Sequence, residues 1–188
     1  SGVRGAAQLL EQTRDARDQE LTRLIIEETD RICALVDRME IFTDNPRIER
    51  SAVNIHVVLN HVVKLARTGF GSKVRIVEEY DPSLPPAYGD HDQLVQVFLN
   101  LVKNAVEAVP ESGGEVVVST AFQHGMRMTA QSGQGQVHLP LVVSNRDNGD
   151  GVPEDLRGHL FDPFITTKPG GTGLGLALVA KLVGDHGG

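Results

Sequence analysis

The chain has 188 residues, of which 40% are hydrophobic and 23% charged, and its formal net charge is −7 at pH 7. This length and apolar content predict one folded domain with an appendage and exclude a wholly disordered chain. The acidic balance argues against a nucleic-acid partner. A single cysteine, Cys33, excludes a disulfide framework and a multi-cysteine zinc site. Because no apolar run reaches the ~20 residues of a membrane span and no signal peptide is recognisable, we expect a cytoplasmic protein without a membrane partner.

The first part of the chain has a helical pattern. Residues 1–12 indicate the end of a helix, residues 13–18 a turn, and a second helix runs to about Asp44 before the stop signal Asn45-Pro46. The apolar residues of the second helix follow alternating steps of four and three, with Glu28 as the only break: Leu21, Ile25, Ile32, Leu35, Met39 and Phe42. This seam is typical of a coiled coil or helical bundle, so we expect a homodimer through these helices. A helix packed on its own domain is the alternative.

The remaining chain alternates between helices and strands. The expected elements are a linker (45–53), a short helix capped by Asn54 (to about 67), a strand (73–80), a long helix capped by Asp90 (91–109), a strand (115–122), a loose hairpin connection (123–136), a strand (137–144) and a final helix (173–185). Strict βαβ repetition is absent. The pattern therefore predicts an α+β fold, in which a helical hairpin precedes an α/β sandwich with a mixed sheet.

The long helix carries the first candidate site. Its polar residues Gln96, Asn100, Asn104 and Glu107 are three or four apart and so form one stripe. Asparagine is a mediocre helix former, so two within one helix invite a functional explanation. Neutral amide oxygens can ligate Mg²⁺ beside phosphate oxygens without repelling a polyanion. An ordinary solvated helix face is the alternative.

A glycine-containing segment, Asp147-Asn148-Gly149-Asp150-Gly151, follows a strand expected to end near Ser144. Its glycines permit a tight turn and the close approach of a flat ligand. A carboxylate at Asp147 can accept a hydrogen bond from the exocyclic amino group of adenine, whereas guanine presents a carbonyl there. A plain turn is the alternative, because Asn-Gly and Asp-Gly pairs are common in hairpins.

A second glycine-rich segment, Gly170 to Leu176, opens the final helix. Backbone N–H groups at such a helix start bind phosphate. The segment matches neither the P-loop nor the dinucleotide fingerprint. Residues 152–169 before it have the composition of a lid, with Phe161 and Phe164 as expected apolar anchors and Lys168 as a cation that can reach a phosphate.

Together these stretches resemble the nucleotide-binding domain of bacterial sensor histidine kinases, whose Bergerat ATP fold is shared with gyrase, Hsp90 and MutL. The motifs are the asparagine box NLVKNAVEA, the first glycine box DNGDG, the phenylalanine box FDPF and the second glycine box GGTGLGL, in that order. The stretches GVRGAAQLLE, YDPSLP and TAFQ are similar to the nitrogen-regulation, or NtrB-type, branch of these kinases.

The resemblance implies a role for each motif residue. Asn104 would coordinate Mg²⁺ bridging the phosphates of ATP, and Asn100 would contact the phosphates or the metal. Asp147 would recognise the adenine amino group, in a pocket shaped by Gly149 and Gly151. The remaining implied contacts are with phosphates: Lys103, Lys168 at the γ-phosphate, and Thr172, Gly173, Leu174 and Gly175.

The resemblance also implies how the chain is organised. Residues 1–44 would be part of the dimerisation and phosphotransfer helices, 45–53 a linker, and 54–188 the catalytic domain, with the family's closing strands beyond Gly188. The acceptor histidine would precede Ser1, so no catalytic residue is expected here. The seven histidines, including His56, His61, His91 and His186, are expected to be surface or packing residues.

The function implied is protein-histidine kinase activity. The complete kinase would transfer the γ-phosphoryl group of ATP to a histidine, and then to an aspartate of an NtrC-like response regulator, with a PII signal protein as a further partner. This chain alone would bind ATP–Mg²⁺ without autophosphorylating. Two alternatives stay open. One is an ATP hydrolase of the gyrase/Hsp90/MutL branch, although Asn100 stands where that branch has its glutamate base. The other is an inert dimerisation or nucleotide-binding module.

Overall fold

The computed structural model describes residues 48–123, 127–129, 136–138, 141–168 and 171–188. The chain divides into two units, residues 1–46 and residues 47–188. The predicted helical hairpin, its apolar seam and Cys33 lie outside the described residues, and so does the dimer contact expected there. Within the described ranges, no helix is both long and apolar enough to cross a membrane.

Three α-helices and one 3₁₀ helix are present in the described part: α3 (Ile55–Thr68), α4 (His91–Ala108), η1 (Glu154–His159) and α5 (Gly175–Asp185). The strands are β1 (Ser51–Val53), β2 (Arg75–Glu79), β3 (Ala87–Gly89), β4 (Glu115–Phe122), β5 (Arg127–Thr129), β6 (Gln136–His138) and β7 (Leu141–Asp147). The predicted helix caps are confirmed. The Asn54 side chain accepts from the His56 N–H at 3.0 Å, and Asp90 Oδ1 accepts from the N–H groups of Asp92 and Gln93.

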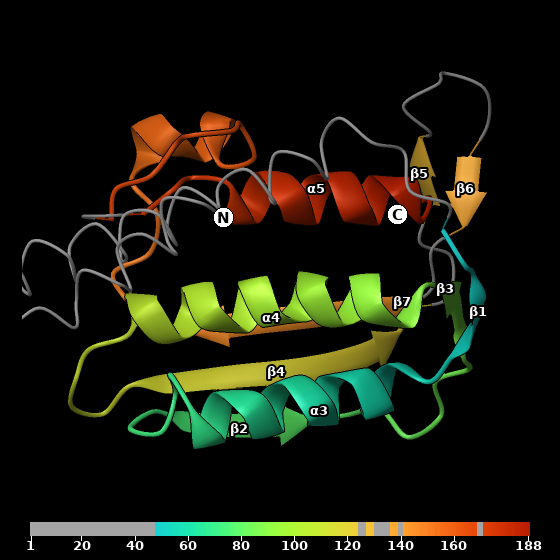
Figure 1. The fold of residues 1–188 in the computed structure, drawn as a ribbon, viewed down its shortest axis with the longest axis horizontal. Helices are drawn as coiled ribbons and strands as arrows, with labels where there is room; N and C mark the ends of the chain where they lie inside the picture. Colours follow the sequence, from blue (N-terminus) through green and yellow to red (C-terminus); the bar gives the residue numbers. More distant parts are fainter. Residues whose placement is uncertain (1–47, 124–126, 130–135, 139–140, 169–170) are drawn as a thin grey trace, which may run out of the picture. The chain divides into compact units, whose positions relative to one another are not determined.

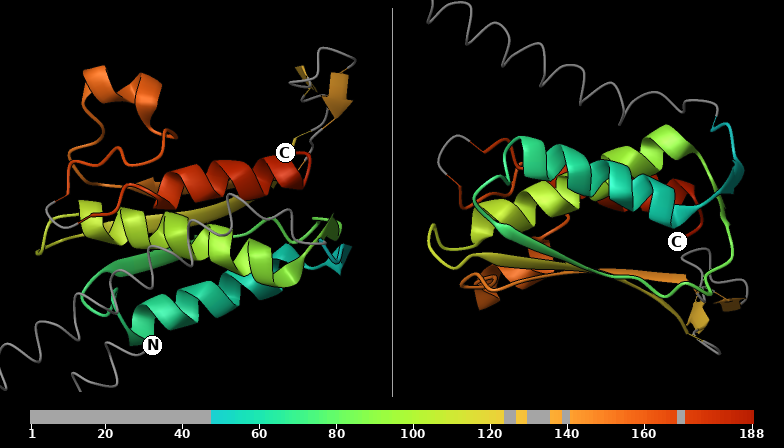
Figure 2. Two further views of the ribbon diagram at one scale, coloured as in Figure 1. Left: turned by 45° about the horizontal axis from the view of Figure 1, so that its top comes forward. Right: turned by 90° about the horizontal axis from the view of Figure 1, so that it is seen from below.

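The main sheet has the order β2-β4-β7, with β2 parallel to β4 and β4 antiparallel to β7. Helices α3, α4 and α5 lie on one face of this sheet (Figures 1 and 2). The layer between them is formed by fully buried aliphatic side chains, among them Val58, Leu59, Val62, Val102, Val116, Val118 and Leu178. The predicted α/β sandwich with a mixed sheet is therefore confirmed.

Three local predictions were wrong. The strand expected over 137–144 is two strands in different sheets, β6 paired with β5 and β7 paired with β4, and β7 continues to Asp147. The segment 123–136 expected as a loose connection contains β5. The last three residues of the expected linker form β1, which pairs with the unpredicted β3. A three-residue strand forms because of its hydrogen bonds and packing with a partner strand. The propensities of its own residues therefore predict it poorly.

A polar network lies at the Phe122 end of β4. Thr120 is the buried polar residue there, and its Oγ1 accepts from the Asp81 N–H at 2.9 Å and lies 3.1 Å from His56 Nε2. The His56 ring stacks on Tyr80 with a centroid distance of 5.1 Å, and burial raises the pKa of the Tyr80 hydroxyl above its ordinary value. Hydrogen bonds from Ser83 hold the pKa of the Asp81 carboxyl below its usual value.

Candidate functional site

The second half of α4 faces the beginning of α5. The two helices run side by side in opposite directions (Figure 1). Asn100 uses its Nδ2 to donate to the Gln96 carbonyl at 2.8 Å, which directs its Oδ1 toward α5. A Cβ placed on Gly175 would lie 3.2 Å from Asn100 Oδ1 and 3.8 Å from Asn104 Nδ2. The two amides thus meet the amino-terminal end of α5, where unpaired backbone N–H groups point outward.

The lid is tied to the same part of α4 through Lys168. Its Nζ lies 2.6 Å from Glu107 Oε2 and 3.5 Å from the Asn104 carbonyl oxygen. Lys103 Nζ lies 3.8 Å from the other Glu107 oxygen. One carboxylate therefore holds both cations predicted to contact phosphate. All three side chains are partly exposed, so these ion pairs are weak and can exchange for a stronger anion.

The first glycine box packs against the end of α4. Asp147 is the last residue of β7, and its Oδ1 accepts from the Gly149 N–H at 3.0 Å. A Cβ on Gly149 would lie 2.3 Å from the Ala108 carbonyl oxygen, so only glycine permits this approach. Gly151 has a φ of +77°, which also favours glycine. The exposed carboxylate of Asp147 is thereby fixed next to the last turn of α4.

Asn148, in the middle of the same box, stabilises the turn. Its Oδ1 accepts from the Glu115 N–H at 2.8 Å, and its Nδ2 donates to the Gly113 carbonyl at 2.9 Å. Sequence reasoning missed this role, since both partners are far from Asn148 in the chain and only the pairing of β4 with β7 brings them together.

The second glycine box is joined to the phenylalanine box. The Phe164 N–H donates to the Gly173 carbonyl at 3.0 Å, and a Cβ on Gly173 would lie 2.4 Å from the Phe164 carbonyl carbon. Both residues have a positive φ, 69° at Phe164 and 66° at Gly173. Phe161 and Phe164 are 57% and 59% exposed, so neither is buried as the expected apolar anchor of the lid in this structure.

Leu174, implied by the resemblance to contact phosphate, is a buried residue. Its side chain is 1% exposed and belongs to the core, so only its backbone can face a ligand. Thr172 and Gly175 are half-buried beside it. The structure thus brings three of the sequence-predicted residues, Gly149, Lys168 and Gly175, to one surface strip of α4 between Asn100 and Ala108. Glu107, which joins that strip to the lid, was noted only as part of the polar stripe; its signal was the i, i+4 spacing from Lys103.

Comparison with known proteins agrees with this arrangement. Residues 89–188 match the family model described as histidine kinase-, DNA gyrase B-, and HSP90-like ATPase. The whole chain is 64% identical over 188 residues to the sensory histidine kinase/phosphatase NtrB of Azospirillum brasilense, covering 47% of that protein. It is 40% identical over 195 residues to NtrB of Escherichia coli O157:H7, covering 52%. The chain thus spans about half the length of the curated relatives it matches.

Solved structures show the same fold. Full-length ShkA in complex with AMPPNP superposes with a TM-score of 0.76 at 28% identity, covering 99% of this chain and 38% of ShkA. The mycobacterial sensor histidine kinase MprB superposes with a TM-score of 0.59 at 25% identity, covering 73% of this chain and 80% of MprB. The resemblance noted from the motifs is therefore confirmed. The chain belongs to the histidine kinase-, DNA gyrase B- and HSP90-like ATPase family, and over its full length it matches the corresponding half of the NtrB kinases.

Proposed function

We propose that this chain is the ATP-binding catalytic core of a protein-histidine kinase that acts in nitrogen regulation. The observation that carries the proposal is that one strip of α4 contacts all three ligand-binding segments. Gly149 approaches Ala108, Lys168 reaches Glu107, and Gly175 lies against Asn100. The residues assigned to adenine, to phosphate and to the lid therefore border one site. The family match and the AMPPNP complex of the similar kinase ShkA support a nucleotide as its ligand.

The residues at this strip fit a magnesium ion carried by a triphosphate. Within the described residues no hydrogen bond involves the Asn104 side chain, and none holds Asn100 Oδ1. The described part of the chain also contains no cluster of three or more His, Cys, Asp or Glu residues able to hold a metal alone. Protein sites for Mg²⁺ commonly supply only one or two oxygens and leave the rest to phosphates and water. Asn104 and Asn100 would hold the ion, which would neutralise phosphate charge when bound.

The protein's own contribution is positioning. The glycine box at the start of α5 offers backbone N–H groups to the phosphates, and the helix dipole favours negative charge there. Lys168 exchanges Glu107 for the terminal phosphate, and Lys103 adds positive charge nearby. Asp147 accepts from the adenine amino group. Little covalent chemistry is required of these residues, because phosphoryl transfer depends mainly on alignment and charge neutralisation.

The proposal for the acceptor and the partners is supported by the names of the relatives. In this proposal, residues 1–44 are part of the dimerisation and phosphotransfer helices without the acceptor histidine, residues 45–53 are the linker, and residues 54–188 are the catalytic domain. The phosphoryl group passes to a histidine on the dimerisation helices and then to the aspartate of a response regulator. The names of the NtrB relatives include both kinase and phosphatase, which supports regulation in both directions. A PII signal protein is proposed as a further partner. The kinase ThkA, of the same fold, is known in complex with its response regulator TrrA.

A direct assay separates this function from the two alternatives. The chain is mixed with γ-labelled ATP, Mg²⁺ and a separate polypeptide carrying the acceptor helices of the Azospirillum NtrB. We expect acid-labile, base-stable phosphohistidine on that polypeptide and none on this chain. Steady release of inorganic phosphate without phosphohistidine would indicate the hydrolase. A folded chain that binds no nucleotide would indicate the inert module.

One residue of α4 disfavours the hydrolase. Asn100 stands where that branch has its glutamate base, and an amide cannot take a proton from water at neutral pH.

Purine selectivity tests the assignment of Asp147. We expect the chain to prefer ATP to GTP, because a carboxylate accepts from the adenine amino group and repels the guanine carbonyl. Asp147→Asn should lower this preference at least about tenfold, since hydrogen bonds to charged groups contribute about 1.5–3 kcal/mol. The measurement is the ratio of the two dissociation constants by calorimetry, with Asp150→Asn as the matched control. Equal affinity of the unmodified chain for both nucleotides would refute the assignment.

A further inference from the structure

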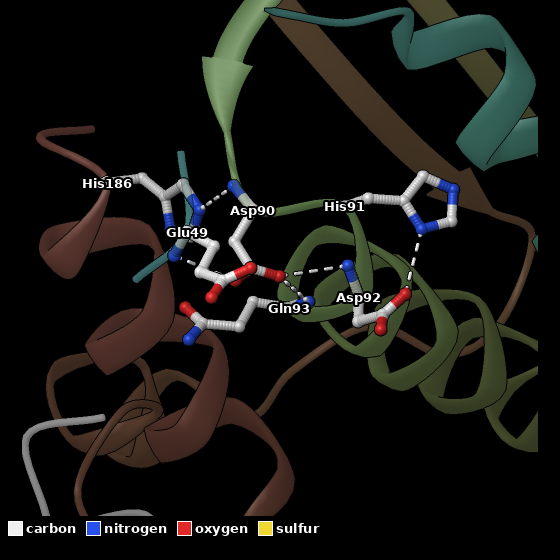
Figure 3. A network of polar contacts seen from close by, with 6 residues as sticks. All are labelled: Glu49, Asp90, His91, Asp92, Gln93 and His186. Carbon is white, nitrogen blue, oxygen red and sulfur yellow. Dashed lines mark hydrogen bonds and ion pairs between the residues drawn. The ribbon is translucent and has the colours of Figure 1, made fainter. Parts of the chain in front are cut away.

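His186 is packed at the corner where α5 ends and α4 begins. Its Nε2 lies 2.9 Å from the backbone nitrogen of Asp90, and its Nδ1 lies 2.7 Å from the carbonyl oxygen of Leu182 (Figure 3). A backbone N–H can only donate and a carbonyl can only accept. The ring is therefore neutral in this arrangement, with the proton on Nδ1 and a bare Nε2.

The fit around the ring is close. A Cβ placed on Gly89 would lie 2.7 Å from His186 Cδ2 and 3.2 Å from Nε2. Glycine at the end of β3 is thus required for the imidazole to reach the Asp90 N–H. This feature connects β3, α4 and α5 through one side chain.

Asp90 extends the connection to the segment that follows the first unit of the chain. Its Oδ1 caps α4, while its Oδ2 accepts from the Glu49 N–H at 3.3 Å (Figure 3). Next to Glu49, the Arg50 guanidinium donates to the Asp185 carbonyl at 2.5 Å. The segment 48–50 is consequently bonded to the N-cap residue of α4 and to the last residue of α5.

These two helices carry the candidate site at their opposite ends. Asn104 lies fourteen residues along α4 from Asp90, which corresponds to about 21 Å at 1.5 Å per residue. Gly175 is at the far end of α5. Because packed helices move as rigid bodies, their alignment at one end affects the distance between Asn104 and Gly175 at the other.

We propose that His186 is a positioning residue, whose neutral ring holds the segment 48–50 and the α4–α5 pair in the alignment that binds nucleotide. The nucleotide part of this proposal rests on the proposed function. A displacement of the segment 48–50 would reach the site through Asp90 and His186. The chain thereby has a physical connection between the segment leaving its first unit and the residues that bind phosphate.

Three variants of the full chain test the connection. His186→Ala removes both ring contacts. His186→Gln can retain them, since its side-chain oxygen accepts and its amide nitrogen donates at a similar separation. Gly89→Ala leaves His186 in place but inserts a Cβ against the ring. The controls are His61→Ala, an exposed histidine of α3, and Val62→Ala, which weakens the core away from the corner.

The first readouts need no nucleotide. Ring ¹⁵N NMR should show Nδ1 protonated and Nε2 bare. Amide hydrogen exchange at Glu49 and Asp90 should accelerate about fivefold in His186→Ala and Gly89→Ala, as expected when a bond worth about 1 kcal/mol is lost, and stay slow in His186→Gln. A proton on Nε2, or unchanged exchange in both His186→Ala and Gly89→Ala, would overturn the proposed positioning role of His186.

The second readout is the affinity for AMPPNP–Mg²⁺. His186→Ala and Gly89→Ala should weaken it severalfold, while His186→Gln and His61→Ala keep it near the wild-type value. The same weakening in Val62→Ala would reduce the effect to general instability and overturn the proposal, as would unchanged affinity in His186→Ala. A wild-type chain that binds no AMPPNP would contradict the proposed function itself. The NMR and exchange results would still decide whether His186 holds the segment 48–50 and the α4–α5 pair.

Discussion

Replacing Asn104 by alanine should weaken binding of ATP–Mg²⁺ on the order of 100-fold or more while leaving the fold intact. The side chain lies half-buried beside Gly175 and makes no hydrogen bond within the described residues, so its removal costs little packing. Loss of outer-shell partners alone typically lowers metal affinity 10–100-fold, so loss of a direct ligand should cost on the order of 100-fold or more. The measurement is the dissociation constant with and without Mg²⁺ by calorimetry, alongside the thermal midpoint.

Asn60→Ala provides the matched control. Asn60 is an exposed asparagine on α3, so the same substitution there changes the helix composition equally without touching the site. If Asn104→Ala binds ATP–Mg²⁺ as tightly as Asn60→Ala does, Asn104 is not a metal ligand. A second diagnostic is that Asn104→Ala should lose the dependence of affinity on Mg²⁺.

Gly149→Ala should lower both stability and nucleotide affinity, because the added Cβ has no room. The added Cβ would lie 2.3 Å from the Ala108 carbonyl oxygen and 2.8 Å from its carbon, far inside van der Waals contact with backbone that cannot rotate away. The first glycine box must then move off the end of α4 and take Asp147 with it. We expect the free energy of unfolding to fall by about 1–3 kcal/mol, as for other overpacked sites. Nucleotide affinity should fall at least about tenfold, since the proposed adenine contact of Asp147, a hydrogen bond to a charged group, would contribute about 1.5–3 kcal/mol.

The control for this substitution is Gly158→Ala in η1. A Cβ there meets nothing within 4 Å, and its φ does not lie in the left-handed region. Denaturant unfolding and ATP titration of both variants separate the close approach of Gly149 from the general effect of replacing a glycine. Equal stability and affinity of the two variants would show that the box does not depend on its contact with α4.

Local chemistry made much of the domain predictable from sequence. Asn54 and Asp90 are cap residues whose signal lies within three positions of the helix they begin, and both caps form. The strand over 115–122 was predicted with the observed bounds, because it is a long β-branched run bounded by a glycine turn. The short strands were missed since β1 and β3 acquire their structure from each other.

The candidate site shows the same division. Sequence alone marked the amide stripe of α4, the two glycine boxes and Lys168, because unusual residue types at regular spacing stand out locally. It could not show that Glu107 holds the lid lysine, that Asn148 fastens the turn after β4, or that Phe161 and Phe164 are exposed. Those facts depend on which distant segments meet in space.

The amino-acid order by itself determined the helix starts, the mixed α/β class and the chemistry available to a nucleotide. Only the tertiary structure decided that this chemistry meets along one strip of α4, and that His186 holds the opposite ends of the same helices. The physical reason is the sequence distance over which each interaction acts. Helix caps, turns and hydrophobic periodicity depend on residues a few positions apart, whereas the contacts between α4, α5 and β7 join distant segments through burial of a shared core.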